Sequence, residues 1–151
     1  MSSQPARGTA REHIEWEADP RHAEILLAAL GLQNVSKSVV TPGVKVPGGA
    51  DERPLGPADR ELYRSNTMRL VYLALDRPEL QFAGKELARY MQQPTAENLV
   101  ALKRTGRFLI GARRLVQQFV AQDPPGEVRV CADSDHAGCL KTRKSTSGCY
   151  V

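Results

Sequence analysis

The most regular alternation of apolar and polar residues lies between Pro57 and Gly111, and it predicts three consecutive helices. Proline suits a first helical turn, and from there an apolar stripe rich in leucine continues to Leu75. Pro78 cannot continue this helix, because it lacks the backbone N–H that a helix interior needs. Asp76 and Glu79 have the spacing of a capping box. We therefore expect the next helix to begin here.

The second predicted helix runs from about Arg77 to Met91, and the third follows Pro94-Thr95 and ends at Gly111. The apolar side of the second holds Leu80, Phe82, Ala83, Leu87 and Met91. The third carries Leu99, Leu102, Gly106 and Leu109 at three- and four-residue steps. Glycine costs about 1 kcal/mol relative to alanine inside a helix, so Gly106 predicts a close approach to another backbone.

A shorter helix is expected before this block. Asp19-Pro20 forms an N-cap and first-turn pair, and Gly31 is placed to end the helix. Its apolar face holds Ala23, Leu26, Leu27 and Leu30. His22 lies in the first turn, where we expect a solvated side chain rather than a metal ligand, because no second ligand lies near it. Residues 1–18 show little periodicity and are expected to be a disordered N-terminus.

Residues 36–56 are rich in proline and glycine, a composition that disfavours both helices and central strands. We expect a linker that follows the surface in an extended conformation. A short edge pairing between Val39-Val40 and Val44-Lys45-Val46 stays open as an alternative.

In the last part of the chain, residues 115–151, apolar and polar residues alternate with a two-residue period. Leu115–Val120 is rich in β-forming residues, and Glu127–Ala132 alternates as a half-buried strand does. With the turn Asp123–Gly126 between them they predict a hairpin, and Ser145–Val151 predicts a further strand. A sheet that begins here has no covering elements, so we expect a truncated C-terminus.

Composition sets limits on the core and on the compartment. Hydrophobic residues make up 41% of the chain and aromatic residues 5%, so the core must consist mainly of Leu, Val and Ala, which favours packed helices. Three cysteines without a CxxC pair indicate reduced thiols. No apolar run is long enough to span a bilayer, and the first residues lack a signal core. We expect a soluble intracellular protein of the cytoplasm or nucleus, with no membrane partner.

The net charge of +4 is concentrated on the predicted helices. Residues 57–114 contain eleven Lys and Arg against six Asp and Glu, whereas the flanks are nearly neutral. The third helix places three basic residues opposite its leucines, and two more follow its end: Lys103, Arg104, Arg107, Arg113 and Arg114. Such a face can contact phosphates without reading sequence. A solvated face that only keeps the helix soluble is the open alternative.

The helical block also resembles a known family, the Pol polyproteins of copia-type retrotransposons, in the segment after the polymerase palm. The resemblance rests on an ordered series: Tyr63-Arg64-Ser65, Tyr72-Leu73-Ala74, Arg77-Pro78-Glu79-Leu80, Phe82-Ala83, Leu87-Ala88-Arg89-Tyr90-Met91, Pro94-Thr95, Leu102-Lys103-Arg104 and Arg107-Phe108-Leu109. It implies that residues 57–114 form the thumb and connection of a reverse transcriptase, which grip the template and primer, and that residues 19–35 form the helix leaving the palm. The implied partners are a primer–template duplex or an RNA/DNA hybrid, and the remainder of the polyprotein.

A second resemblance covers Val130–Gly138 and Thr142–Gly148, which look like the opening of the copia-type ribonuclease H domain. It implies that Asp133 occupies the position of the first catalytic, metal-holding carboxylate. Two Mg²⁺ ions about 4 Å apart need several carboxylates from separate elements, whereas only Asp135 follows Asp133 here. The family's other carboxylates are expected beyond Val151, so the implied cofactor, Mg²⁺, belongs to an intact parent and none is expected in this fragment.

Other metal sites fit the same stretch poorly. An EF-hand fails because Lys144 stands where a glutamate is required, and Cys131, His136 and Cys139 lack a recognised zinc spacing. The resemblance also implies palm aspartates for polymerase chemistry, including an adjacent pair that this chain lacks.

The expected fold is mainly α, a helical bundle followed by a short, incomplete α+β ribonuclease H-like β segment. The first hypothesis is a Pol polyprotein fragment without polymerase or nuclease activity of its own. The second is a free-standing helical module that binds nucleic acid independently of sequence.

Overall fold

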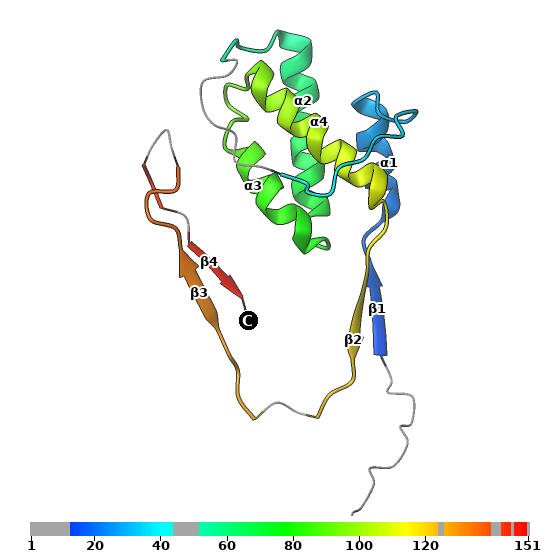
Figure 1. Cartoon of the computed structure of the whole chain (residues 1–151), viewed down its shortest axis with the longest axis vertical. Helices are drawn as coiled ribbons and strands as arrows, with labels where there is room; N and C mark the ends of the chain where they lie inside the picture. Colours follow the sequence, from blue (N-terminus) through cyan, green and yellow to red (C-terminus); the bar gives the residue numbers. More distant parts are fainter. Residues whose placement is uncertain (1–12, 44–51, 124–125, 140–142, 146, 151) are drawn as a thin grey trace, which may run out of the picture. The chain divides into compact units, whose positions relative to one another are not determined.

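A computed structural model describes residues 13–43, 52–123, 126–139, 143–145 and 147–150. The chain divides into two units, Glu17–Leu115 and a second formed by Met1–Trp16 with Val116–Val151. In chain order the elements are β1 (His13–Glu17), α1 (Pro20–Ala29), α2 (Pro57–Leu73), a short 3-10 helix η1 (Pro78–Leu80), α3 (Gln81–Ala88), α4 (Ala96–Gly111), β2 (Val116–Val120), β3 (Cys131–Ser134) and β4 (Ser147–Tyr150) (Figure 1).

The helix α1 begins and ends as the sequence predicts. The Asp19 side chain accepts a hydrogen bond from the backbone N–H of Arg21 at 2.9 Å, which satisfies one of the free donors of the first turn. Gly31 follows the last turn with φ of 68°, a left-handed conformation that glycine adopts without strain. The predicted apolar face of Ala23, Leu26, Leu27 and Leu30 is buried.

The prediction for the second helix of the block is partly wrong. Its first residues form η1, whose N-cap is Arg77 rather than Asp76, and Arg77 makes no side-chain capping bond. The helix α3 ends at Ala88 instead of Met91. The guanidinium of Arg64 donates to the backbone carbonyls of Met91 and Gln92 at 2.7 and 2.8 Å, which stabilises a turn there in place of further helix.

The helix α4 confirms the predicted start after Pro94-Thr95 and the end at Gly111. Thr95 and Asn98 form a capping box, in which the backbone N–H of Thr95 donates to Asn98 Oδ1 at 2.9 Å. Asn98 is buried, so the bond is shielded from competing water.

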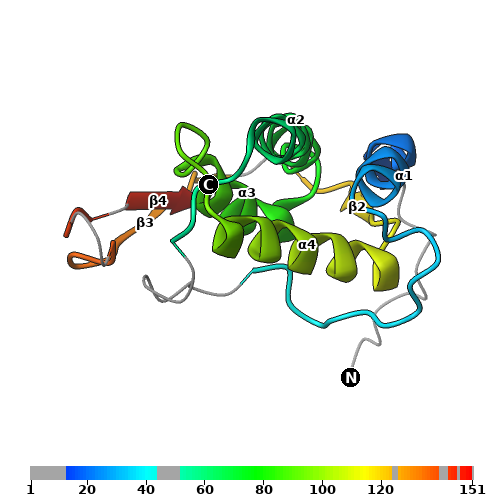
Figure 2. The same cartoon turned by 90° about the horizontal axis from the view of Figure 1, so that it is seen from above.

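These four helices form one packed unit in which α2 lies between α1 and α3, and α4 crosses all three (Figure 2). Five leucines from α1, α2, η1 and α4 are fully buried at the centre of this packing: Leu26, Leu70, Leu80, Leu102 and Leu109. The buried Tyr63 hydroxyl donates to the Leu87 carbonyl at 2.7 Å, which links α2 to α3. Burial raises the pKa of Tyr63, so the phenol stays protonated and keeps this bond.

Gly106 lies where α4 crosses α1. A Cβ at this position would come within 2.6 Å of Leu32 Cδ1 and 3.1 Å of Leu30 Cδ1. The prediction of a close approach is confirmed, but the neighbours are leucine side chains and not another backbone.

The predicted linker packs along the helical unit where it is described. Thr105 on α4 donates through its hydroxyl to the Pro42 carbonyl at 2.9 Å, and Leu55 is buried. Pro54 forms an isolated antiparallel bridge with Thr95. The alternative pairing of Val39-Val40 with Val44–Val46 involves residues outside the described part of the chain.

The strand unit contains two separate two-stranded sheets, β1 with β2 and β3 antiparallel to β4. His13–Glu17 is therefore a strand, and the expectation of disorder is wrong there. The predicted hairpin is also wrong, because β2 pairs with β1 and the strand predicted at Glu127–Ala132 lies later, at β3. It is not half-buried either, since all four β3 residues are exposed. The predicted strand near the C-terminus is confirmed as β4.

Candidate nucleic-acid interface

The helix α4 presents basic residues on the side opposite its buried leucines. Lys103 is exposed, and Arg104 and Arg107 are half-buried, whereas Leu102, Thr105 and Leu109 face the core. Positions 103 and 107 are one helical turn apart and are therefore neighbours on the surface. Among the described residues no ion pair involves these three cations. We call Lys103, Arg104 and Arg107 the basic face.

The two predicted arginines after α4 are arranged differently. Arg114 donates to both carboxylate oxygens of Glu17, at 2.6 and 2.7 Å. This hydrogen-bonded pair lowers the pKa of Glu17 and raises that of Arg114. Arg113 has an exposed side chain, and its backbone carbonyl accepts a hydrogen bond from Arg77 at 3.2 Å. The structure thus brings together three of the five predicted basic residues and pairs Arg114 elsewhere.

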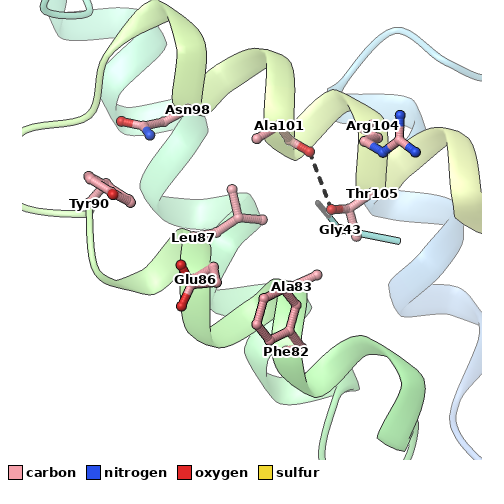
Figure 3. A pocket seen from close by; sticks show the side chains of 10 residues that line it. All are labelled: Gly43, Phe82, Ala83, Glu86, Leu87, Tyr90, Asn98, Ala101, Arg104 and Thr105. Atoms are coloured by element: carbon pink, nitrogen blue, oxygen red, sulfur yellow. Dashed lines mark hydrogen bonds between the residues drawn. The ribbon is translucent and has the colours of Figure 1, made fainter. Parts of the chain in front are cut away.

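A groove of about 460 Å³, including its open side, lies between α3 and α4 (Figure 3). Arg104 and Thr105 line it from α4, and Phe82, Glu86 and Leu87 line it from α3. The remaining lining residues are Gly43, Ala83, Tyr90, Asn98 and Ala101. Arg104 donates from Nη2 to Thr41 Oγ1 at 2.9 Å, but its buried Nε has no hydrogen-bond partner among the described residues.

Glu86 is the acidic group in this groove. Burial raises its pKa, but hydrogen bonds from Lys85 and Arg89 outweigh burial, so its pKa is lowered overall. Lys85 lies 2.8 Å and Arg89 3.1 Å from Glu86 Oε1. The two neighbouring cations therefore offset the negative charge of Glu86 beside the basic face.

The pattern of apolar and polar residues gives no indication that the Arg77 side chain is buried. Its side chain is only 1% exposed and donates to Glu79 Oε1 at 2.8 and 2.5 Å. The same guanidinium donates to the Arg113 carbonyl just after α4, so it connects the α2–α3 turn to the residues that follow the basic face. The Arg77-Pro78-Glu79 sequence in a predicted turn has a spacing that lets the two charged side chains pair, but it does not indicate that Arg77 is buried.

His22 is not the freely solvated residue that its first-turn position predicts. Its ring lies 4.9 Å from the Tyr72 ring, and its Nδ1 is 3.4 Å from Arg69 Nη1. The packing of α1 against α2 partly buries it.

Asp133, the candidate first carboxylate of a metal site, lies on the exposed strand β3 opposite Gly148. Asp135 folds back against Gly138, where an added Cβ would collide with its carboxylate. No cluster of three metal-ligating side chains occurs in the part of the chain that the structure describes. These donors do not fit a pair of Mg²⁺ ions.

Among the described helices, none combines the length and the apolar character that crossing a membrane requires.

Comparisons with known proteins identify relatives in Arabidopsis thaliana. The chain is 34% identical over 86 residues to an uncharacterized mitochondrial protein, an alignment that covers 57% of this chain and 35% of that protein. It is 35% identical over 89 residues to the retrovirus-related Pol polyproteins from transposons RE1 and RE2, over 59% of this chain and 6% of each polyprotein. The chain thus spans about a third of the first relative and a small part of the others. No family model and no solved structure matches the chain.

Proposed function

Because this chain is a homologue of part of the retrovirus-related Pol polyproteins of transposons, we propose that its helical unit binds the backbone of a nucleic-acid duplex. The observation that carries the proposal is the basic face of α4, whose three cations have no ion-pair partner among the described residues. The implied ligand is a primer–template duplex or an RNA/DNA hybrid. A free-standing module and a piece of a polyprotein would use the same face.

Binding by such a face depends on charge and not on base sequence. Lys103 and Arg107 neutralise phosphates, and each neutralised phosphate releases bound counterions. The logarithm of the association constant should fall with the logarithm of salt concentration, with a slope of about −0.9 for each phosphate contacted on B-form DNA. Binding should be equal for unrelated sequences, because contacts to phosphate carry no direct sequence information.

The test is a charge reversal, Lys103→Glu with Arg107→Glu, measured by fluorescence anisotropy with a labelled duplex at low salt. We expect affinity to fall by a factor of about ten or more, since two phosphate contacts become repulsive. The matched control, Arg129→Glu with Lys144→Glu, changes the net charge equally at exposed positions of the strand unit. Equal losses in both variants would mean that net charge alone drives binding, and no loss in either would reject the proposal.

Within the same family we propose the copia type, with the helical unit as thumb and connection and the last strands as the start of ribonuclease H. The support is the ordered series of motifs in residues 57–114 and the sequence around Asp133. We further propose that the isolated chain does not cleave an RNA/DNA hybrid, because Asp133 lies alone on an exposed strand and two-metal hydrolysis needs several carboxylates. Magnesium-dependent cleavage by pure protein that disappears in Asp133→Ala would refute this.

A further inference from the structure

The segment Ser38–Gly43, which we call the strap, runs beside α4 on the side away from α2 (Figure 2). The strap contacts α4 of the helical unit at several points. Ser38 lies against Gly111, where an added Cβ would come within 3.1 Å of its side chain. The Thr41 hydroxyl accepts from Arg104, and the Pro42 carbonyl accepts from Thr105, each at 2.9 Å. The strap therefore places one exposed hydroxyl, that of Thr41, beside the basic face.

Thr41 has the local sequence that proline-directed protein kinases require. Thr41-Pro42 is the only Ser-Pro or Thr-Pro pair in the 151 residues. Proline disfavours a helical conformation in the residue before it, and the structure places Thr41 outside any helix or strand. Its side chain is exposed. A kinase that binds an extended Thr-Pro segment can therefore reach this hydroxyl.

Arg104 provides a second and independent observation. Its Nη2 already points at Thr41 Oγ1, and its buried Nε is a donor without an acceptor among the described residues. A buried donor without a partner is destabilising, so an additional acceptor close to Arg104 Nε would be stabilising. A phosphate on Oγ1 would bring three acceptor oxygens to the guanidinium.

We propose that Thr41 is a phosphorylation site and that Arg104 holds the resulting phosphate. The kinase transfers the γ-phosphoryl group of a nucleoside triphosphate to Thr41 Oγ1. The bond between the γ-phosphorus and its bridging oxygen breaks, the Oγ1–phosphorus bond forms, the hydroxyl proton passes to the kinase's base, and nucleoside diphosphate leaves. The product carries a charge of about −1.5 to −2 beside Lys103, Arg104 and Arg107.

The consequence for binding rests on the proposed function. A phosphate paired with Arg104 occupies one of the three cations and repels the phosphates of a duplex. We expect the phosphorylated chain to bind a duplex about fivefold or more weakly at low salt.

The test uses the full chain, a purified proline-directed kinase and adenosine triphosphate. Mass spectrometry should locate one phosphate on Thr41 and none in Thr41→Ala. The second pKa of the phosphate, followed by ³¹P NMR, should lie below about 6 in the wild type and return toward about 6 in Arg104→Gln. Arg104→Lys keeps the charge and serves as the second variant if Arg104→Gln does not fold. The second pKa of the phosphate in Arg104→Lys should lie between the values of the wild type and Arg104→Gln. In Arg129→Gln it should equal the wild-type value. Absence of phosphate on Thr41, or the same titration in all variants, would overturn the inference.

Duplex binding separates this inference from the proposed function. If the second pKa of the phosphate depends on Arg104 but the chain does not bind a duplex, the phosphorylation site is supported and the proposed function is rejected. Duplex binding that is unchanged by phosphorylation of Thr41 overturns the inferred effect of the phosphate on binding and leaves the proposed function standing.

Discussion

The helical unit and the strand unit of this chain differ in how their side chains are used. In the helical unit each helix contributes residues to a shared core, and leucines such as Leu70 and Leu102 are fully buried. In the strand unit β2 and β3 are almost entirely exposed, and Val130 beside β3 is 63% exposed. Both units form regular backbone hydrogen bonds, but among the described residues nearly all the buried apolar side chains lie in the helical unit. We therefore expect burial, and not secondary structure alone, to determine where the chain is stable.

Amide hydrogen exchange gives the largest expected contrast. Amides between Leu62 and Leu109 should exchange only when the helical unit unfolds, whereas those of Cys131–Ser134 and Ser147–Tyr150 should exchange by local opening. Two strands without a covering layer are marginally stable in water. The experiment is native-state exchange followed by mass spectrometry or NMR, and slow exchange across β3 and β4 in a monomer would remove the contrast.

A pair of core and strand substitutions measures the same difference by mutation. Leu102→Ala should lower the free energy of unfolding by about 2–5 kcal/mol, because it leaves a cavity in a fully buried site. Val130→Ala should change it by less than about 0.5 kcal/mol, since its side chain is mostly exposed. Urea titrations of both variants provide the measurement. Similar losses would show that the strand unit shares a core with the helices.

The buried arginine should have a smaller effect than the core leucine. Arg77→Met should lower the free energy of unfolding by about 1–3 kcal/mol, because it leaves Glu79 and the Arg113 carbonyl without their donor. The loss is limited because the Glu79 side chain is 30% exposed and can be solvated. Arg89→Met, which removes a more exposed ion pair, should cost less than about 1 kcal/mol. If the double variant Arg77→Met with Glu79→Gln is as unstable as the sum of both single variants, the pairing is irrelevant.

The smallest effect is expected from the cap of α1. Hydrogen bonds from the side chain and backbone of Arg21 lower the pKa of Asp19 from 3.8 to about 2. A carboxylate with a lowered pKa in the folded state stabilises the fold above its unfolded pKa, and this contribution disappears as the pH falls from about 4 to 2. Asp19→Asn should therefore show a shallower acid decline in its urea midpoint, and below pH 2 the two proteins should converge. The exposure of this pair keeps the difference small.

Much of the helical unit could be predicted from the sequence because its signals are local. Asp19, Gly31 and Thr95 each fix one end of a helix through bonds to neighbouring residues. The errors occur where a distant residue decides the structure. Arg64 stabilises the turn after α3 by bonding to residues 27 and 28 positions away, and nothing near Met91 indicates this.

The strands show even more clearly that prediction from local sequence fails where distant residues determine the structure. β1 alternates Ile14 and Trp16 with polar residues, but this alternation is too short to predict a strand, and its partner lies about a hundred residues later in β2. Pairing between such distant segments depends on the whole chain. The prediction that Leu115–Val120 pairs with the nearer segment Glu127–Ala132 is therefore wrong. In the candidate site, helical spacing alone predicts that Lys103 and Arg107 lie next to each other on one face of α4. The pairing of Arg114 with Glu17 and the contact of Arg104 with Thr41 could not be predicted, because the partners come from distant segments.

Gly106 has no charge, yet the close packing of α4 at this residue helps to set how the basic face is oriented on the helical unit. Any other residue type at this position would meet the side-chain ends of Leu32 and Leu30. Where these leucines do not yield, a larger residue would shift α4 away from them, and Lys103 and Arg107 would move with it. A copy of this sequence could thus keep every basic residue and lose their alignment through one uncharged substitution.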